Sequence, residues 1–251
     1  MIEKKYKIPF YVIWTGFFII WLGISTVVYS SIVVIFGFIS YSAAYSVMKH
    51  WCKMLVFFSG INLEVEGFDK LDKKSQYMFI INHTSAFDIP VLVIGIPLFT
   101  NFIAKKELFF IPLFGHGLRT IGHISIDRSN ARDALKSMKK AIDQLRRKGR
   151  SLILFPEGTR SSTGRVGEFK RASFALAKDA GIKMVPVLIH GADTIARKNS
   201  WFLTPGSVKI IIADPVPEEI VVQSSKEELK DIAFNTVLAM QNNQYELAAK
   251  R

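Results

Sequence analysis

The residue pair His83 and Asp88 offers the clearest chemistry in the sequence. The two lie five positions apart in the segment NHTSAFD, residues 82–88. A carboxylate that accepts the Nδ1–H of an imidazole fixes its tautomer and leaves Nε2 as a general base. On a regular helix this spacing separates two side chains by roughly 140°. We therefore expect a helix to begin between them, with Ser85 or Asp88 as its N-cap and its positive end beside the ionised carboxylate.

A second segment, FPEGTRS at residues 155–161, adds weight to a pair that on its own arises easily by chance. It combines a glycine, two hydroxyl groups and the guanidinium of Arg160, which suits bidentate binding of a phosphate. Each segment follows a short apolar run of the kind that forms a buried strand. Because ligands of open α/β sheets bind at the carboxyl ends of strands, we expect both segments at one edge of a sheet.

The elements that must position these segments are short apolar strands alternating with helices. Strands are predicted at residues 61–65, 77–81, 101–104, 123–126, 151–155, 183–189 and 208–212, and the clearest helices at 130–148, 169–180 and 226–249. Continuous apolar strands in alternation with helices are typical of a mostly parallel sheet covered on both faces. The sequence thus predicts an α/β domain over residues 58–251.

The first 57 residues have a different composition, because Ile8 to Met48 contains no Lys, Arg, Asp or Glu. About 20 apolar residues cross a bilayer, and the apolar region of a cleavable signal has about 7 to 15. Lysines flank both ends of the run, which predicts both ends on the cytoplasmic side. We therefore expect a membrane-anchoring two-helix hairpin over residues 1–57, with its turn near Gly23 to Thr26. It either lies in one leaflet or spans twice, and a single tilted span is the alternative.

The overall composition narrows the remaining classes. The chain has 33 Lys and Arg against 21 Asp and Glu, a formal charge of +12, which suits anionic lipid head groups. No nucleic-acid-binding motif accompanies this charge, so we expect no nucleic acid partner. Cys52 is the only cysteine, which excludes a disulfide framework. The five histidines show no helical pair for zinc, and the sequence has no Walker loop or Gly-x-Ser-x-Gly elbow, so no metal and no cofactor are predicted.

The two segments together resemble the first and third motifs of the glycerolipid acyltransferase family, and lysophosphatidic acid acyltransferases in particular. GHISIDR at residues 122–128, preceded by FIAKKEL at 102–108, resembles the middle block, and VPV at 185–187 the short fourth motif. The resemblance covers roughly residues 77–190. It implies transfer of an acyl group from a thioester, either acyl-coenzyme A or acyl-carrier protein, to the sn-2 hydroxyl of 1-acylglycerol 3-phosphate. The product would be phosphatidic acid, and the donor is a substrate, not a cofactor.

The resemblance also implies a role for each candidate residue. His83 and Asp88 are the base dyad, and direct attack needs no covalent intermediate. Asn82 and Ser85 are expected to support the loop. The phosphate and glycerol of the acceptor are assigned to Arg160, Glu157, Gly158, Thr159, Lys105 and Arg128.

Three further questions stay open at this stage. The acceptor is alternatively glycerol 3-phosphate, another lysophospholipid or an amine, with the same chemistry. A non-enzymatic basic module that binds anionic lipid is the alternative from another class. The apolar stretches Leu92 to Phe99 and Leu108 to Phe114 either wall an acyl tunnel or fill the core, and core is the better interpretation.

Overall fold

The computed structural model describes residues 2–126, 137, 142–143, 149–196 and 202–249. In this part of the chain, seven strands form one sheet in the order β1-β7-β6-β2-β5-β3-β4. They are β1 Ile61–Glu66, β2 Tyr77–Ile81, β3 Thr100–Lys105, β4 Ile124–Ile126, β5 Ser151–Leu154, β6 Lys183–His190 and β7 Gly206–Ile212. Every pairing is parallel except β6 with β7. The predicted mostly parallel α/β sheet is confirmed.

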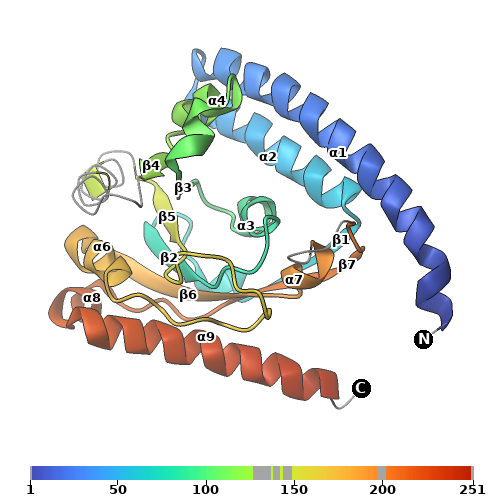
Figure 1. Ribbon diagram of the computed structural model, residues 1–251. Helices are drawn as coiled ribbons and strands as arrows, with labels where there is room; N and C mark the ends of the chain where they lie inside the picture. The colour runs from blue at the N-terminus through green and yellow to red at the C-terminus, as the bar shows by residue number, and fades with distance from the viewer. Residues whose placement is uncertain (1, 127–136, 138–141, 144–148, 197–201, 250–251) are drawn as a thin grey trace.

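Helices cover both faces of the sheet (Figure 1). One layer holds α1 Ile2–Gly37, α2 Tyr41–Phe58, α3 Asp88–Gly95 and α4 Phe114–Ile121; the other holds α6 Ser173–Ala180, α8 Glu218–Gln223 and α9 Lys226–Ala249. Short elements are η1 Phe68–Lys70, η2 Lys106–Phe110 and α7 Ala192–Ile195.

The strand β2 shows how the sheet serves both layers. Because successive side chains point to opposite faces, Tyr77, Phe79 and Ile81 join the core under α1 to α3, and Met78 and Ile80 join the core under α6 and α9. All five are buried. An uninterrupted apolar run is what a strand with two covered faces requires.

The N-terminal hairpin turns later than the sequence predicted. Instead of turning near Gly23 to Thr26, α1 continues to Gly37, and the chain reverses over residues 38–40. The hydroxyl groups of Ser25 and Thr26 donate to the carbonyl of Leu22, so these polar residues are satisfied inside the helix and do not interrupt it. The reversal occurs where Ser40 caps α2, its Oγ accepting the N–H of Ala43 at 3.1 Å.

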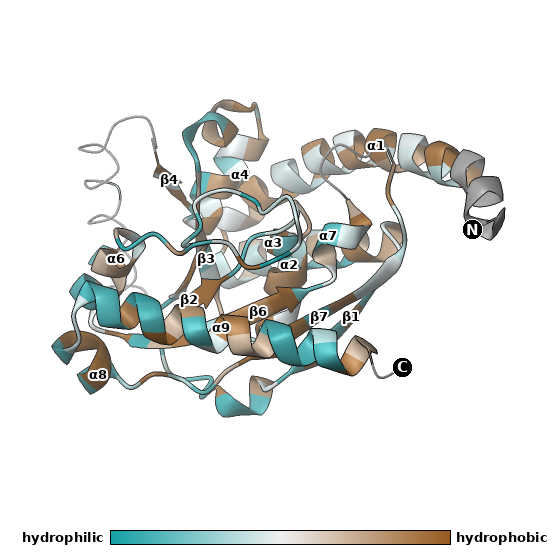
Figure 2. Ribbon diagram, turned by 60° about the horizontal axis from the view of Figure 1, so that its bottom comes forward, coloured by the Kyte–Doolittle hydropathy of each residue, from teal (hydrophilic) through white to brown (hydrophobic). Residues whose placement is uncertain are grey.

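The two helices of the hairpin are antiparallel and partly exposed. The indole N–H of Trp14 donates to the carbonyl of Phe58 at 2.9 Å, which joins the beginning of α1 to the end of α2. Among the described residues, one stretch, Phe10–Gly37, is long and apolar enough to cross a membrane; its mean hydropathy is 2.2 and 22% of it is buried. Figure 2 shows hydrophobic residues along α1.

The remaining predictions concern three helices, Arg128 and the domain boundary. The helix predicted over 226–249 is confirmed as α9. The helix predicted from residue 169 begins only at Ser173, because Lys170 donates its backbone N–H to Pro156 and belongs to the preceding loop. The helix predicted over 130–148 and the candidate residue Arg128 lie almost entirely outside the described residues. The boundary between an anchor at 1–57 and a domain at 58–251 stays a prediction.

Candidate active site

The two motif segments meet at one edge of the sheet. β2 pairs in parallel with both β5 and β6, so the carboxyl ends of all three strands lie at that edge. Residues 82–88 follow β2 directly, and residues 155–161 follow β5. The helix α3 then begins at Asp88, which leaves His83 in the loop as expected.

His83 and Asp88 are in direct contact. The Nδ1 atom of His83 lies 2.7 Å from Oδ2 of Asp88. The same oxygen accepts the backbone N–H groups of Thr84 at 2.7 Å and Ser85 at 3.0 Å, and Asp88 is fully buried. An oxygen with two N–H donors is an acceptor, so Nδ1 of His83 carries the proton and Nε2 is the basic nitrogen. The imidazole side chain is 21% exposed, which leaves it within reach of a substrate.

The start of α3 differs from the predicted cap. Phe87 occupies the N-cap position and makes no side-chain capping bond. Asp88 turns its carboxylate back to the N–H groups of Thr84 and Ser85, and the Ser85 hydroxyl accepts the N–H of Phe87 at 3.3 Å. Neither Ser85 nor Asp88 is therefore an N-cap, and both stabilise the loop that carries His83.

The loop after β5 holds the backbone of His83 on both sides. Oε1 of Glu157 accepts the N–H of His83 at 3.1 Å, and the N–H of Ser161 donates to the carbonyl of His83 at 2.7 Å. The ring of Phe155 stacks on the imidazole with centroids 4.3 Å apart. The backbone position and the ring plane of His83 are thus fixed by the second motif as well as by Asp88.

The side chain of Glu157, which accepts the N–H of His83, is buried. It is 7% exposed, and burial raises the pKa of its carboxyl group above the ordinary value, against the lowering effect of the N–H groups of His83 and Gly167. Gly158 follows with φ +73°, a conformation that side chains disfavour, and a Cβ there would lie 3.0 Å from Nζ of Lys170. Glu157 therefore orders the loop that carries His83.

Asn82 ties the loop to the neighbouring strand. Its side-chain amide donates to the carbonyl of Ile189 at 2.9 Å and accepts the N–H of Ile189 at 2.8 Å. The residue is fully buried. It thus extends the pairing of β2 with β6 by one residue, which matches the positioning role expected of it.

The candidate anion-binding residues are arranged less tightly. Thr159 and Arg160 are exposed in the loop after β5. Lys105 ends β3 at the same edge of the sheet and forms an exposed ion pair with Glu107, Nζ to Oε1 3.3 Å. Arg128 lies outside the described residues. The structure therefore connects His83 to both Asp88 and Glu157, and it leaves Arg160 and Lys105 exposed.

Other titratable groups stand apart from this chemistry. The buried His123 accepts the N–H of Phe102 at 3.2 Å, and burial, together with Arg150, lowers its pKa to about 3, so it stays neutral. No group of three or more His, Cys, Asp or Glu residues in the described ranges is placed to hold a metal ion.

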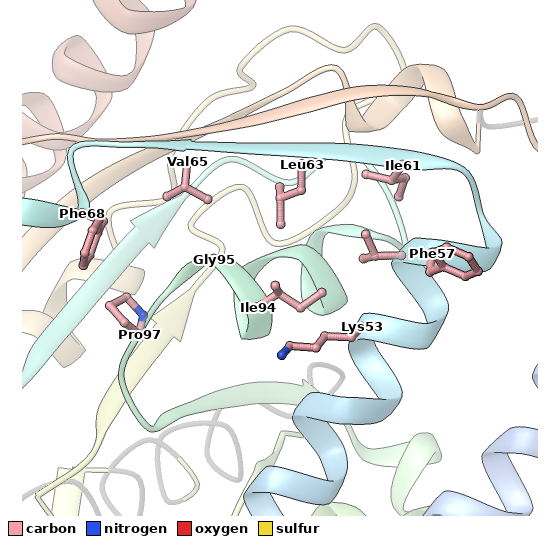
Figure 3. A pocket seen from close by; sticks show the side chains of 10 residues that line it. Lys53, Phe57, Ile61, Leu63, Val65, Phe68, Ile94, Gly95 and Pro97 are labelled. Atoms are coloured by element: carbon pink, nitrogen blue, oxygen red, sulfur yellow. The ribbon is translucent and has the colours of Figure 1, made fainter.

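The stretch Leu92 to Phe99 lies partly in the core and partly along a hollow. Leu92, Val93 and Ile96 are fully buried in the core. Ile94, Gly95 and Pro97 line an apolar hollow of about 540 Å³ between α2, α3 and the edge strand β1, with Lys53 beside it (Figure 3). β7 and β6 separate β1 from β2 in the sheet. The acyl tunnel stays a prediction, and most of this stretch is core.

Known proteins resemble this chain in sequence and architecture. The model of the family described as Acyltransferase matches residues 62–190, more than half of the chain. The chain belongs to the acyltransferase family. A relative in Pseudomonas aeruginosa named 1-acyl-sn-glycerol-3-phosphate acyltransferase is 32% identical over 69% of this chain and 68% of its own length. Relatives of the same name in Limnanthes alba and Cocos nucifera are 34% and 36% identical over 65% of this chain.

The plant relatives are longer, and the chain matches 57% and 53% of their lengths. A solved structure extends the likeness to nearly the whole fold of this acyltransferase. The crystal structure of the 1-acyl-sn-glycerophosphate acyltransferase PlsC from Thermotoga maritima superposes with a TM-score of 0.83 at 27% identity, covering 94% of this chain and 96% of that one. The family resemblance seen in the sequence is thereby confirmed.

Two contributors to the site were missed from the sequence. Phe155 and Ser161 are the first and last residues of the second motif, but their roles depend on the position of His83 across the sheet edge. A third, Phe87, packs against Phe18 of α1 with ring centroids 5.9 Å apart. Only the position of the hairpin could have indicated this contact, and the predicted turn placed the hairpin wrongly.

Proposed function

We propose that this acyltransferase is a 1-acylglycerol-3-phosphate O-acyltransferase. It transfers an acyl group from acyl-coenzyme A or acyl-carrier protein to the sn-2 hydroxyl and so forms phosphatidic acid for phospholipid synthesis. The observation that carries the proposal is the contact of His83 with the buried Asp88, held by the loop of Glu157. The names of the relatives support the choice of acceptor.

The dyad supports direct acyl transfer. Nε2 of His83 takes the proton of the sn-2 hydroxyl, and the oxygen attacks the thioester carbonyl carbon. The tetrahedral intermediate then expels the thiolate by breaking the C–S bond, and the imidazolium returns its proton to the sulfur. Asp88 stabilises the imidazolium throughout, as the carboxylate of a triad does. A thioester is reactive enough that no serine or cysteine nucleophile is required.

Arg160 is the proposed partner of the acceptor phosphate. That group carries a charge of about −1.5 to −2 at neutral pH. Arg160 lies three residues after Glu157, whose side chain contacts His83. A guanidinium in this loop can bind the phosphate while the glycerol hydroxyl approaches Nε2.

The hairpin is the proposed membrane attachment, with the active site on the cytoplasmic face. Thr15 accepts the N–H of Leu203 near the beginning of α1, and Gly37 packs against Thr120 of α4 at its end. The two points are about 33 Å apart along the helix. If α1 crossed the bilayer upright, one of these parts of the α/β domain would have to enter the far leaflet. This supports a hairpin that lies in one leaflet, which is one of the arrangements expected from the sequence.

Purified protein in detergent tests the reaction. We expect wild type to release thiol from an acyl thioester and to form phosphatidic acid from 1-acylglycerol 3-phosphate. His83→Ala should lose both products while remaining folded, and His116→Ala, an exposed histidine of α4, is the matched control. Full turnover in His83→Ala would refute the proposed base. Thiol release without phosphatidic acid would indicate another acceptor or water.

A further inference from the structure

Residues 108–113, LFFIPL, form an apolar segment that runs from the second half of η2 to the start of α4 and is largely exposed; it is called the 108–113 tip below. Leu108 is 38% exposed, Phe110 68%, Ile111 45% and Leu113 40%, whereas Phe109 is buried beneath them. Single exposed apolar residues are common on soluble surfaces, but a contiguous group marks an interaction site. The tip is thus neither core nor the wall of an enclosed tunnel, which were the two interpretations of this stretch.

The backbone of the tip is strained. Leu113 has φ +60° and ψ −53°, and it is the only non-glycine residue of the described chain with a positive φ. The N–H of Phe114 donates to the carbonyl of Pro112, so Leu113 is the central residue of a strained γ-turn, a conformation that glycine would adopt more easily. A leucine at this position keeps an apolar side chain at the surface at a conformational cost. That combination indicates that the side chain has a partner.

The tip lies beside the apolar hairpin. α4, which begins directly after the tip, runs along the second half of α1, with Gly117 near Ser30 and Thr120 against Gly37. Both views show α4 next to that end of α1 (Figures 1 and 2). Ile24, in the same half of α1, is 63% exposed. The tip is therefore joined directly to the helix that packs on the half of α1 in which Ile24 is exposed.

Basic residues border the tip. Lys106 and Arg119 line a hollow of about 520 Å³ together with Phe110. The guanidinium of Arg119 lies 5.6 Å from the ring centre of the buried Phe109. Apolar side chains with a basic border are the combination that binds the interface of an anionic membrane.

We propose that the 108–113 tip is a second membrane contact. Phe110, Ile111 and Leu113 enter the boundary between head groups and acyl chains, and Lys106 and Arg119 bind an anionic lipid head group beside them. The inference rests on the proposed attachment of the hairpin and adds to it. If the hairpin were the only membrane contact, the hairpin and the α/β domain together could rotate about the hairpin axis on the membrane surface. A second contact fixes that rotation, and because η2 follows β3 at the edge where His83 lies, it holds the active-site edge near the bilayer.

Site-specific fluorescence tests the contact with the full chain. An environment-sensitive fluorophore is attached to Phe110→Cys or Ile111→Cys in a Cys52→Ala background and reconstituted in vesicles that contain phosphatidylglycerol and spin-labelled lipid. Ile24→Cys reports the hairpin. Val222→Cys is the control, because Val222 is 49% exposed on α8 in the opposite layer.

We expect the lipid quencher to remove most emission from positions 110, 111 and 24 and none from 222. If position 24 is quenched and the tip behaves like 222, the second contact is refuted and the hairpin attachment stands. If position 24 is not quenched either, the membrane attachment fails as well, and the inference fails with it.

The head-group part has its own test. In Lys106→Gln/Arg119→Gln, quenching at position 110 should no longer increase when phosphatidylcholine vesicles are replaced by vesicles with phosphatidylglycerol. The control Lys73→Gln/Lys226→Gln removes the same charge elsewhere and should keep the increase. If the lipid dependence survives in the first double variant, these two cations do not bind the head group. Turnover in detergent should be unchanged in both variants.

Discussion

The loops after β2 and β5 supply the two halves of the active site and are built differently. In the loop after β2, Asp88 and Asn82 are fully buried and their polar groups bind the backbone around them. In the loop after β5, Glu157 is buried, whereas Thr159 and Arg160 are exposed. The base is therefore held in place by hydrogen bonds within the protein itself. The cation proposed for the acceptor has to be ordered by its ligand, which costs side-chain entropy. Damage to the first loop should lower kcat, and damage to the second should raise KM.

The largest effect is expected for Asp88→Asn. The carboxamide oxygen can take the place of Oδ2 beside His83, Thr84 and Ser85, but it carries no negative charge, so the imidazolium that forms during proton transfer loses its stabilisation. We expect kcat to fall by about 100 to 10,000-fold, with little change in KM. Initial rates of thiol release over a range of acceptor concentrations separate the two parameters.

Asp214→Asn is the matched control, since Asp214 forms an exposed ion pair with Lys70. Exposed pairs contribute little, so its kinetics should equal those of wild type. A rise in KM with unchanged kcat in Asp88→Asn would mean that the dyad binds substrate and does not act as the base.

Arg160→Ala tests the other half of the comparison. Loss of a charge-assisted contact of about 1.5 to 3 kcal/mol should raise KM for 1-acylglycerol 3-phosphate roughly 10 to 100-fold. kcat should change much less, because the dyad does not contact this side chain. Arg165→Ala, an exposed arginine in the same connection to α6, serves as control. An unchanged KM in Arg160→Ala would assign the phosphate to another residue.

Contacts within one short segment could be predicted from the sequence, whereas contacts between the two loops could not. The dyad could be predicted because His83 and Asp88 belong to one short segment, and only a helix start between them allows contact. The strands were predictable because runs such as Tyr77 to Ile81 are apolar on both faces. Contacts between segments distant in the sequence could not be predicted, and the bonds from Glu157 and Ser161 to His83 are of this kind.

The hairpin turn was wrong for a local reason. Gly23 and the hydroxyl residues after it look like a break, but inside an apolar helix the hydroxyls bond the preceding turn and the helix continues. The turn depends on a smaller signal, the Ser40 cap. The composition predicted an anchor of two helices, but the length of each helix is seen only in the structure.

We expect Asn82→Ala to lower the stability of the protein, because Asn82 ties the loop after β2 to the strand β6. The substitution leaves the N–H and carbonyl of Ile189 without their partners in the core, at about 1 to 3 kcal/mol for each group. We expect the free energy of unfolding to fall by about 2 to 6 kcal/mol, measured as a lower denaturation midpoint in detergent. Asn62→Ala, on the exposed side of the edge strand β1, should have a small effect. Equal midpoints for the two variants would refute the role of Asn82 in joining β2 to β6.

The smallest expected effect concerns the one carboxyl group that joins the two loops. Burial raises the pKa of Glu157 above its ordinary value of 4.5. A group with a raised pKa contributes stability that is complete below its unfolded pKa and is lost as the pH rises through the folded pKa. Glu157→Gln keeps an oxygen for the N–H of His83 but cannot ionise. Wild type should therefore lose stability relative to this variant as the pH rises above 4.5.

The sign of this change can be checked against a carboxyl group of the opposite kind. The pKa of Glu228 is lowered by its bonds to Ser225, so its contribution is present above the unfolded pKa and is lost as the pH falls. Against Glu228→Gln, wild type should therefore gain relative stability as the pH rises to the ordinary value of 4.5. Denaturation midpoints of the three proteins on both sides of pH 4.5 give both slopes. If both variants show the slope of Glu228, the hydrogen bonds of Glu157 outweigh its burial, and the loop after β5 is as preorganised as the loop after β2.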